Sequence, residues 1–397
     1  MNFISLFIRR LISVFKKFSI FLIVYLVLDI VFFSLIPEDL KSKLYNNRAH
    51  RIKSFYYHHD FRPMSSFYDL WGYERYKIFT NSLGFKDRSN RLVEFKDRNI
   101  LFIGDSFTEG VGIEYENTYV GLIETEIKKK YKNIEILNAG VQSYSTSIYL
   151  SKIYHLLERK KMPITDIIIM VSGGDIFDDY YKYMDVGEDY ILNHVDQKNK
   201  YLIKLINFYK SNTLIYQIIT RITPPKVIPG LIKSIFNSKD RIENYNENEQ
   251  MYFSISNDEI DNISFLNHKD YSYLYSANEF DQWGRKAIDQ SMQNLKEIIK
   301  ICDQKNIKLN ILYLYEPVII LKKPNEDYFN YMISEFEKLE NLSENLKVNF
   351  IKDLYNKYNN SYEAYKNLFF INDIHWNKRG NLLVSNEILE KVDFLIY

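Results

Sequence analysis

The sequence predicts an α/β protein: a three-layer α/β/α fold around a parallel, flavodoxin-like doubly wound sheet, with an N-terminal transmembrane helix and a large insertion. Two observations predict the sheet. Short apolar runs that end in glycine or polar residues recur after residue 98, and amphipathic helical patterns separate them; this alternation is typical of parallel strands covered by helices on both faces. A third observation, an apolar run near the N-terminus, predicts the membrane helix.

That apolar run covers residues 19–37, holds Asp29 as its only charged residue, and is long enough to cross a bilayer core. Basic residues precede it at positions 9, 10, 16 and 17 and favour a cytoplasmic N-terminus. We therefore expect a cytoplasmic segment at 1–17, a single-pass anchor in the cytoplasmic membrane at 18–37, and a periplasmic remainder. A cleaved signal peptide and a buried core helix are the alternatives. Asp29 costs free energy near mid-span unless it faces a partner.

The rest of the chain divides into two regions. Residues 38–95 are polar and aromatic with short β-like stretches, and we interpret them as a stalk and an accessory β-rich layer. An α/β domain is expected at 96–397. Its strands are predicted at 100–103, 134–137, 167–171, 309–314 and 348–351, and its helices from residue 118 and at 149–157, 287–303 and 381–392. The alternation lapses at about 183–284, which predicts a partly helical insertion that could cover the site.

Composition limits the classes of function. The 52 Lys and Arg residues nearly cancel the 51 Asp and Glu residues, so the chain has no overall attraction to nucleic acid, and we expect no nucleic-acid partner. The single cysteine, Cys302, excludes an intramolecular disulfide and a cysteine-based zinc site. We expect neither a metal nor a cofactor.

Four loops carry polar residues that could take part in catalysis. A doubly wound sheet brings such loops to the carboxyl edge of its strands. They are Gly104-Asp105-Ser106, Asn138-Ala139-Gly140, Ser172-Gly173-Gly174-Asp175 and the stretch from Asn372 to Asn377. Acyl transfer needs a hydroxyl that attacks, an imidazole that takes its proton and a carboxylate that orients the imidazole. We therefore predict Ser106 as nucleophile, His375 as base and Asp373 as the orienting acid.

Other interpretations of these residues remain open. Ser106 is also a plausible helix cap, and Gly140 and Gly174 could simply form tight turns. The sequence lacks a Gly-Lys-Ser/Thr phosphate loop, a Gly-x-Ser-x-Gly elbow and a complete dinucleotide fingerprint. His58-His59-Asp60 has no third spaced ligand for a metal and is expected in a solvated loop. Asp175, Asp178 and Asp179 could hold a divalent cation in a sugar-nucleotide enzyme.

At these loops the chain resembles the SGNH (GDSL-like) hydrolase superfamily. Residues 104–110 (GDSFTEG) are similar to the first block, which carries the nucleophile, and residues 138–141 (NAGV) to the second, whose glycine donates a backbone N–H to the oxyanion. Residues 373–377 (DIHWN) resemble the last block, which carries acid and base. Residues 80–85 (TNSLGF) are similar to a lead-in found in membrane-tethered bacterial members. The resemblance spans about residues 99–392, interrupted by the insertion.

The resemblance implies that the backbone N–H groups of Ser106 and Gly140 hold the oxyanion, with Gly174 as a third contributor. Two departures from the family pattern matter. Gly174 stands where the third block usually has an asparagine that donates to the oxyanion; Asn138 or Ser172 could substitute. Asp373 lies two residues before His375 rather than the usual three, a form that resembles tethered members that modify polysaccharides. Residues expected to contact the substrate are Asp105, Asn138, Asp175 and Trp376.

These features lead to an expected function and to two alternatives. We expect a serine-dependent ester hydrolase or O-acyl (acetyl) transferase that acts on a cell-envelope carbohydrate through an acyl-enzyme on Ser106. The alternative from another class is a catalytically impaired carbohydrate-binding or assembly protein that keeps the fold and works with polysaccharide-assembly partners; Gly174 motivates it. A divalent-metal sugar transferase is the third.

Overall fold

The structure, a computed structural model, describes residues 3–37, 50–54, 56–71, 74–183, 201, 205–206, 208–209, 212–222, 266, 268–392 and 395. Two compact units divide the chain. The first comprises residues 1–50 and 198–242, and the second comprises residues 51–197 and 243–397. Residues 38–49 of the expected stalk and accessory layer and residues 223–265 of the expected insertion lie outside the described residues.

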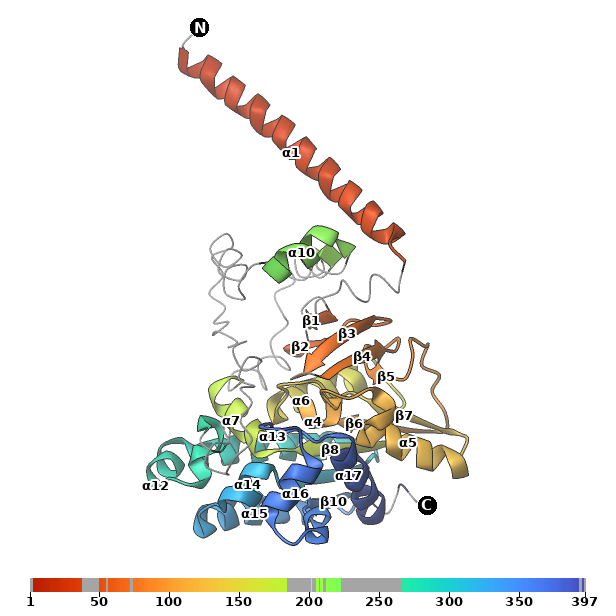
Figure 1. Ribbon diagram of the computed structural model, residues 1–397, viewed down its shortest axis with the longest axis vertical. Helices are drawn as coiled ribbons and strands as arrows, with labels where there is room; N and C mark the ends of the chain where they lie inside the picture. The colour runs from red at the N-terminus through yellow and green to blue at the C-terminus, as the bar shows by residue number, and fades with distance from the viewer. Residues whose placement is uncertain are drawn as a thin grey trace. The chain divides into compact units, whose positions relative to one another are not determined.

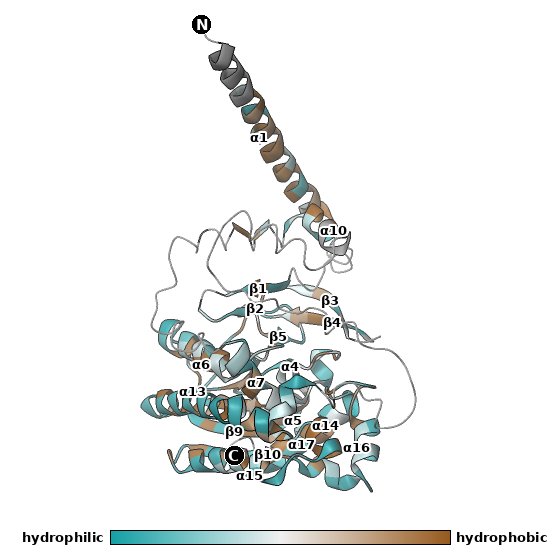
Figure 2. Ribbon diagram, turned by 90° about the vertical axis from the view of Figure 1, so that its left-hand side faces the viewer, coloured by the Kyte–Doolittle hydropathy of each residue, from teal (hydrophilic) through white to brown (hydrophobic). Residues whose placement is uncertain are grey.

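The first unit contains helix α1 (Phe3–Leu35) and helix α10 (Leu214–Ile222). Within α1, the segment Ser13–Leu35 contains an 18-residue window with a mean hydropathy of 2.6, and it is long and apolar enough to cross a membrane, by length and composition. Figure 2 shows this helix coloured mainly as hydrophobic. The helix covers the anchor predicted at 18–37, except for its last two residues.

The second unit is built around an eight-stranded sheet in the order β10-β9-β8-β6-β7-β5-β4-β3 (Figure 1). Its strands are β3 (Ser66–Trp71), β4 (Glu74–Thr80), β5 (Lys86–Asp87), β6 (Arg98–Ile103), β7 (Ile134–Asn138), β8 (Asp166–Val171), β9 (Lys308–Leu314) and β10 (Leu346–Ile351). The five strands from β6 to β10 run parallel. Their order is the flavodoxin-like order that the sequence predicts. A separate two-stranded ribbon pairs β1 (Arg51–Lys53) with β2 (His59–Phe61).

The described part of the accessory layer expected at 38–95 does not form a separate layer, and it makes the mostly parallel sheet a mixed one. Strands β3, β4 and β5 extend the same sheet as antiparallel strands, and β5 joins it by pairing Lys86 with Asn138 of β7. Phe67, Tyr76 and Ile78 from these strands are buried. Their apolar side chains alternate with polar ones, because an antiparallel edge can leave one face to water. The second unit therefore begins at residue 51, not 96.

Helices cover both faces of the sheet because consecutive right-handed crossovers reverse direction at β6. On one face α5 packs on α17 and α17 on α16, and on the other α13 packs on both α6 and α7. The helices, with the 3-10 and π turns labelled η, are α4 (Ser106–Glu109), η1 (Tyr115–Asn117), α5 (Tyr119–Lys130), α6 (Thr146–Tyr154), η2 (His155–Arg159), α7 (Gly173–Tyr181), η6 (Lys269–Leu274), α12 (Ala277–Glu279), η7 (Phe280–Gly284), α13 (Arg285–Gln304), α14 (Pro317–Lys322), α15 (Glu326–Glu340), η8 (Asp353–Lys357), α16 (Ser361–Leu368) and α17 (Lys378–Lys391).

Local sequence explains where these elements begin and end. The Thr118 side chain accepts the N–H of Gly121 and so starts α5, while Lys128, Lys129 and Lys130 in its last turn favour the negative end of the helix dipole. Strand β8 is buried along its whole length, as its uninterrupted apolar run predicts for a central parallel strand.

The end of the insertion predicted at 183–284 also differs from the structure. The segment from η6 to η7 packs on α7 and belongs to the second unit. Three aromatic side chains hold it there, because Tyr271, Tyr273 and Trp283 are all buried. Because polar residues stand between these aromatic ones, the sequence pattern does not reveal that this segment packs into the core.

Candidate active site

Ser106 lies at the junction of β6 and the one-turn helix α4, at the carboxyl edge of the sheet. Asp105 caps this helix, because its Oδ1 accepts the backbone N–H of Phe107 at 2.9 Å. Residue 104 has to be glycine, since a Cβ there would lie 2.1 Å from Oγ1 of Thr108. This tight turn holds the Ser106 hydroxyl in place, and only 8% of the residue is exposed.

His375 and Asp373 come from the loop between α16 and α17, which an isolated bridge between Phe369 and Trp376 closes. Nε2 of His375 lies 2.7 Å from Oγ of Ser106, and Nδ1 of His375 lies 2.6 Å from Oδ1 of Asp373. The same carboxylate oxygen accepts the backbone N–H of His375 at 2.9 Å. The residues expected as nucleophile, base and acid therefore form one continuous hydrogen-bonded chain. The two-residue spacing lets Asp373 hydrogen-bond to both the backbone N–H and Nδ1 of His375.

Trp71 is a site residue that sequence reasoning missed. Its indole Nε1–H donates to Oδ2 of Asp373 at 2.5 Å. Its ring meets the ring of His375 edge to face, with 4.8 Å between centroids. Trp71 ends β3, in the region expected as an accessory layer. No sequence signal links positions 71 and 373; only the antiparallel extension of the sheet brings them together.

Trp376 is a core residue, and its expected contact with substrate stays a prediction. The side chain is buried and its ring packs edge to face against Phe107 and Tyr119, at 4.9 and 6.3 Å between centroids. Phe107 also lies 5.0 Å from the His375 ring. Trp376 therefore supports, by packing, the loop between α16 and α17 that carries Asp373 and His375.

The second block supplies a structural turn beside Ser106. The backbone N–H of Gly140, expected to hold the oxyanion, donates to Oδ1 of Asn138 at 3.1 Å. Asn138 also donates from Nδ2 to the carbonyl of Thr108 at 2.8 Å. Both functional groups of its buried side chain are thus engaged within the protein, and its expected role as a substrate contact stays a prediction. A Cβ on residue 140 would lie 2.6 Å from Cβ of Thr108, so this loop and α4 approach as closely as glycine allows.

The third block forms the first turn of α7. Ser172 and Asp175 make a reciprocal capping box, and Oδ2 of Asp175 accepts both the Ser172 N–H at 3.0 Å and the Tyr149 hydroxyl at 2.8 Å. Asp175 is buried, and its expected contact with substrate stays a prediction. Ser172 Oγ donates to Oδ2 of Asp105 at 3.2 Å. Gly174 lies in this turn, and a Cβ added to it would meet nothing closer than 3.6 Å.

Glu316 is a second residue that the sequence did not reveal. It precedes α14 and is fully buried; its carboxyl accepts the Gly173 N–H and the Tyr271 hydroxyl, both at 2.6 Å. Burial raises the pKa of Glu316 to about 8 and the pKa of Asp105 to about 6. The pKa of Asp175 is also raised, by burial and then by the charge of Asp105. Glu316 is therefore mostly protonated at neutral pH.

Glu109, at the end of α4, is held by an ion pair across the unit. Its side chain is fully buried, and Arg51 donates to its two oxygens at 2.8 and 2.6 Å. The backbone N–H of Gln142 donates to the same carboxylate at 2.6 Å. Burial raises the pKa of Glu109, but Arg51 outweighs this effect and the net shift is downward. The pair joins β1, helix α4 and the loop after the second block.

The aspartates expected to hold a cation are engaged with protein donors. Asp179 accepts from the hydroxyls of Thr146 and Ser291 and from the Ser147 N–H, and Asp178 pairs with Lys182 at 2.9 Å. Within the described residues, no group of three or more His, Cys, Asp or Glu side chains could hold a metal ion.

The triplet His58-His59-Asp60, expected in a solvated loop, lies in a buried network. Nε2 of His59 lies 2.8 Å from the Gln142 carbonyl oxygen, and Asp60 pairs with buried Lys152 at 3.1 Å. Burial lowers the pKa of His59. The triplet therefore packs the two-stranded ribbon onto the body of the unit.

No protein-family model and no curated protein sequence matches the chain. Solved structures do. The psychrotrophic esterase EstA from Pseudoalteromonas sp. aligns with 75% of this chain and 98% of its own, at 13% identity and a TM-score of 0.40. A structure named TesA aligns with 75% of this chain and 100% of its own, at 9% identity and a TM-score of 0.40. For Axe2, an acetylxylan esterase from Geobacillus stearothermophilus, the shares are 75% and 95%, at 10% identity and a TM-score of 0.36.

The chain's own features are more specific than these alignments. The strand order is flavodoxin-like, and the first, second, third and last blocks meet at one carboxyl edge through the contacts of Ser106, Asn138, Ser172 and His375. By this fold and this order of loop blocks, the chain is similar to the SGNH (GDSL-like) hydrolases, the superfamily that its sequence resembles.

Proposed function

We propose that this chain is a serine esterase or O-acyltransferase that forms an acyl-enzyme on Ser106. One observation carries the proposal: the hydrogen-bonded chain from Ser106 through His375 to Asp373, with distances of 2.7 and 2.6 Å. This geometry suits nucleophilic catalysis because base and nucleophile are within hydrogen-bonding reach and a third group orients the base.

In the proposed reaction, Oγ of Ser106 bonds to the acyl carbon of an ester while Nε2 of His375 takes the hydroxyl proton. The alcohol leaves with that proton, and the acyl group remains on Ser106. Water or a sugar hydroxyl then attacks the acyl carbon, gives its proton to His375 and restores the free serine. Asp373 accepts from Nδ1–H of His375, so it selects the tautomer that leaves Nε2 free to act as base.

The oxyanion of the tetrahedral intermediate is assigned to the backbone N–H groups of Ser106, Gly140 and Gly174. For Gly140 to donate, its N–H has to leave Oδ1 of Asn138, where it now lies at 3.1 Å. Gly174 offers no side chain, so the proposed site lacks the side-chain donor that the family pattern implies. Removing one such donor typically raises the barrier by about 2.7–4 kcal/mol, and turnover is therefore expected to be slow.

The substrate and the location form the finer part of the proposal. We assign the acyl group as acetyl and its carrier as a cell-envelope carbohydrate, with α1 as a single-pass anchor and the second unit on the extracytoplasmic side. The length and hydropathy of Ser13–Leu35 support the anchor, and the basic residues before it support the orientation. The form of the last block, Asp373-Ile374-His375-Trp376, supports the carbohydrate.

The test is covalent labelling of the detergent-purified full chain with a fluorophosphonate probe. Labelling is expected, and it should disappear in Ser106→Ala and fall strongly in His375→Ala. Ser385→Ala is the matched control, because Ser385 is also buried but donates only to the carbonyl of Leu382 in α17. Labelling that persists in Ser106→Ala would rule out Ser106 as the nucleophile. Mass spectrometry of Ser106 after incubation with acetyl donors and candidate glycans then separates hydrolysis from transfer.

A catalytically impaired carbohydrate-binding or assembly protein is the second candidate. Two observations favour it: Gly174 lacks a donor side chain, and the Gly140 N–H is already engaged. It predicts glycan binding that is equal in the parent chain and in Ser106→Ala, with no probe labelling in either. Labelling that depends on Ser106 would exclude it.

A further inference from the structure

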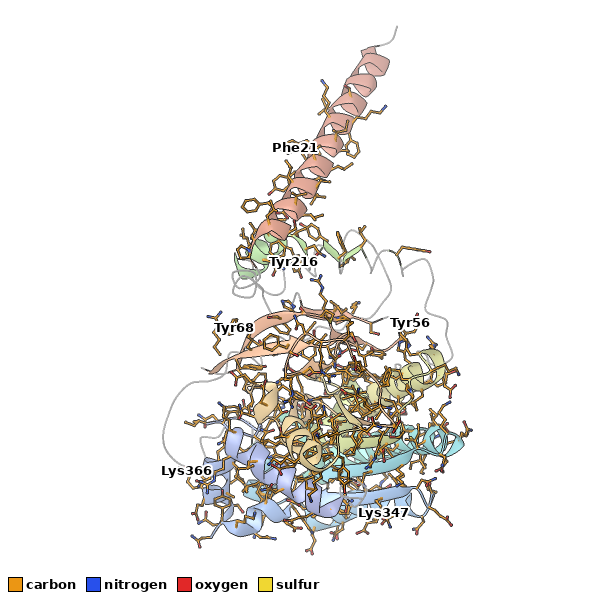
Figure 3. The ribbon with its side chains drawn as sticks, turned by 90° about the vertical axis from the view of Figure 1, so that its right-hand side faces the viewer. Phe21, Tyr56, Tyr68, Tyr216, Lys347 and Lys366 are labelled. Carbon is orange, nitrogen blue, oxygen red and sulfur yellow. The ribbon has the colours of Figure 1, made fainter. Side chains whose placement is uncertain are left out.

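The first unit contains a partner for Asp29, the one charged residue between Ser19 and Leu35 of α1. The backbone N–H of Ile215 lies 3.3 and 3.4 Å from the two carboxylate oxygens of Asp29. Ile215 is in the first turn of α10, so the carboxylate meets the positive end of that helix. Figure 3 shows α10, marked by Tyr216, at the C-terminal end of α1.

The position of Asp29 along the apolar segment determines how deep in the membrane this contact lies. Asp29 precedes Leu35, the last residue of the apolar segment, by six positions, which is about 9 Å at the rise of an α-helix. Helices that lie in a membrane surface bury their apolar face to a depth of about 5–10 Å. The N-terminus of α10 thus meets α1 at the depth where such a helix lies.

Among the described side chains from Tyr201 to Ile218, exposure is opposite to that of a helix facing water. Thr213 and Gln217, four residues apart and so on one face, are buried. Tyr201, Leu205, Phe208 and Ile218, named here the apolar patch, are between 45% and 79% exposed. A water-facing helix buries apolar side chains and exposes polar ones; this segment does the reverse.

The sequence of the same region carries a second, independent signal. From Lys198 to Lys233 it contains no Asp or Glu. Ile215, Ile218, Ile219 and Ile222 follow the i, i+3, i+4, i+7 spacing of an apolar helical stripe. Basic, amphipathic segments bind membrane surfaces that carry anionic lipids. The basic residues of this region are Lys198, Lys200, Lys204, Lys210, Arg221, Lys226 and Lys233.

We propose that α10, together with the side chains of Tyr201, Leu205 and Phe208, forms a second membrane contact that lies in the bilayer surface with the apolar patch in lipid and is held to α1 through Asp29. The occupant of the apolar patch is a phospholipid surface with anionic headgroups. The proposal rests on the proposed anchoring by α1. It gives part of the predicted insertion a role at the membrane, and it removes the cost of an unpaired carboxylate in α1.

The test uses single cysteines labelled with an environment-sensitive fluorophore, in full-length protein inserted one copy per nanodisc of phosphatidylcholine and phosphatidylglycerol. Leu205→Cys, Phe208→Cys and Ile218→Cys report on the apolar patch. Ile23→Cys, in the middle of α1, reports on the anchor, and Lys347→Cys, on the second unit, is the aqueous control. The native Cys302 is buried and its pKa is raised to about 12 by burial, so the parent chain should not label.

Lipids brominated on their acyl chains should quench the labels at 23, 205, 208 and 218 and leave the label at 347 unchanged. Quenching at 23 without quenching at 205, 208 and 218 would overturn the second contact and leave the anchor intact. No quenching at 23 would instead overturn the anchor, and with it this inference. Asp29→Leu should reduce quenching at 218 and spare position 23; unchanged quenching at 218 would overturn the link through Asp29.

Discussion

Trp71 and Asp373 lie 302 residues apart in the sequence, and the indole Nε1–H of Trp71 donates to Oδ2 of Asp373 at 2.5 Å. Oδ1 of the same carboxylate hydrogen-bonds to both the backbone N–H and Nδ1 of His375. Each oxygen of Asp373 thus has its own donors, so the carboxylate cannot rotate without breaking a hydrogen bond to a charged group. The strand that supplies Trp71 belongs to the antiparallel extension of the sheet, which therefore contributes directly to the candidate active site.

Replacing Trp71 by phenylalanine should lower kcat by about tenfold to hundredfold with a smaller change in KM. A hydrogen bond to a charged group is worth about 1.5–3 kcal/mol, and each 1.36 kcal/mol corresponds to about a factor of ten in rate. Hydrolysis of p-nitrophenyl acetate by the full chain measures both constants. Trp283→Phe is the matched control, because Trp283 donates to Glu279 and should leave kcat unchanged. A Trp71→Phe protein with normal kcat would exclude a positioning role.

Gly174→Asn should raise kcat. The neighbours nearest to an added Cβ, the Ser172 and Tyr271 hydroxyl oxygens, are 3.6 Å away, so a β-carbon fits there, and asparagine would bring an amide donor into the first turn of α7. One oxyanion donor is worth about 10²–10³ in kcat, which sets the upper limit of the gain. Gly174→Leu, of similar size but without the amide, is the control. Equal rates in both variants would mean that turnover is not limited by a missing donor.

Glu316 should make the folded protein less stable as pH rises. Its pKa is raised to about 8 by burial, from an ordinary value of 4.5, so between these values the folded protein keeps a proton that the unfolded chain has released. The contribution of this group is complete below pH 4.5 and is lost as pH rises to about 8, at up to about 1.4 kcal/mol per pH unit.

The Glu316→Gln variant tests this pH dependence, because glutamine keeps an acceptor for Gly173 and does not titrate. The free energy of unfolding of the parent chain should fall relative to that of Glu316→Gln between pH 5 and pH 8, the range set by the two pKa values. Chemical denaturation in detergent at several pH values measures it, with Glu126→Gln on the exposed face of α5 as control. Parallel curves for the parent chain and Glu316→Gln would contradict the raised pKa.

Arg51→Met should destabilise the second unit by about 3–5 kcal/mol, because it leaves the buried carboxylate of Glu109 without its partner. Adding Glu109→Gln to Arg51→Met should recover part of the loss, since the uncompensated charge is then gone. Lys129→Met is the control: its pair with Glu126 is exposed, and its removal should change stability by less than about 1 kcal/mol. A loss in Arg51→Met as small as that in Lys129→Met would show that the buried pair contributes little.

The parallel core could be predicted from the sequence because its signals are local. The strand run 167–171 is apolar throughout, and the structure places β8 at Asp166–Val171. The helix predicted from residue 118 is α5, capped by Thr118. Strands β3 to β5 were misassigned because half of their side chains are polar, and such alternation does not say which sheet a strand joins.

The candidate site also contains some residues that could be predicted from the sequence and others that could not. Ser106, Asp373 and His375 could be named because each stands in a short motif beside a predicted strand or helix. Trp71 and Glu316 could not, because their partners are distant in sequence and no local pattern marks them. Asp175 and Trp376 were assigned to substrate because they lie next to the motifs; the structure also gives the first a place in the capping box of α7 and the second a place in the core.

The sequence by itself determined the order of parallel strands, the membrane-length helix and the three residues of the hydrogen-bonded chain, because periodicity and short motifs are properties of neighbouring residues. Only the tertiary structure decided which groups share the site with them. It joined Trp71 to Asp373, placed Glu316 beneath the third block, and engaged Gly140 and Asn138 with each other. The physical reason is that burial and hydrogen-bond partners depend on which elements pack together, and packing unites residues that the chain separates.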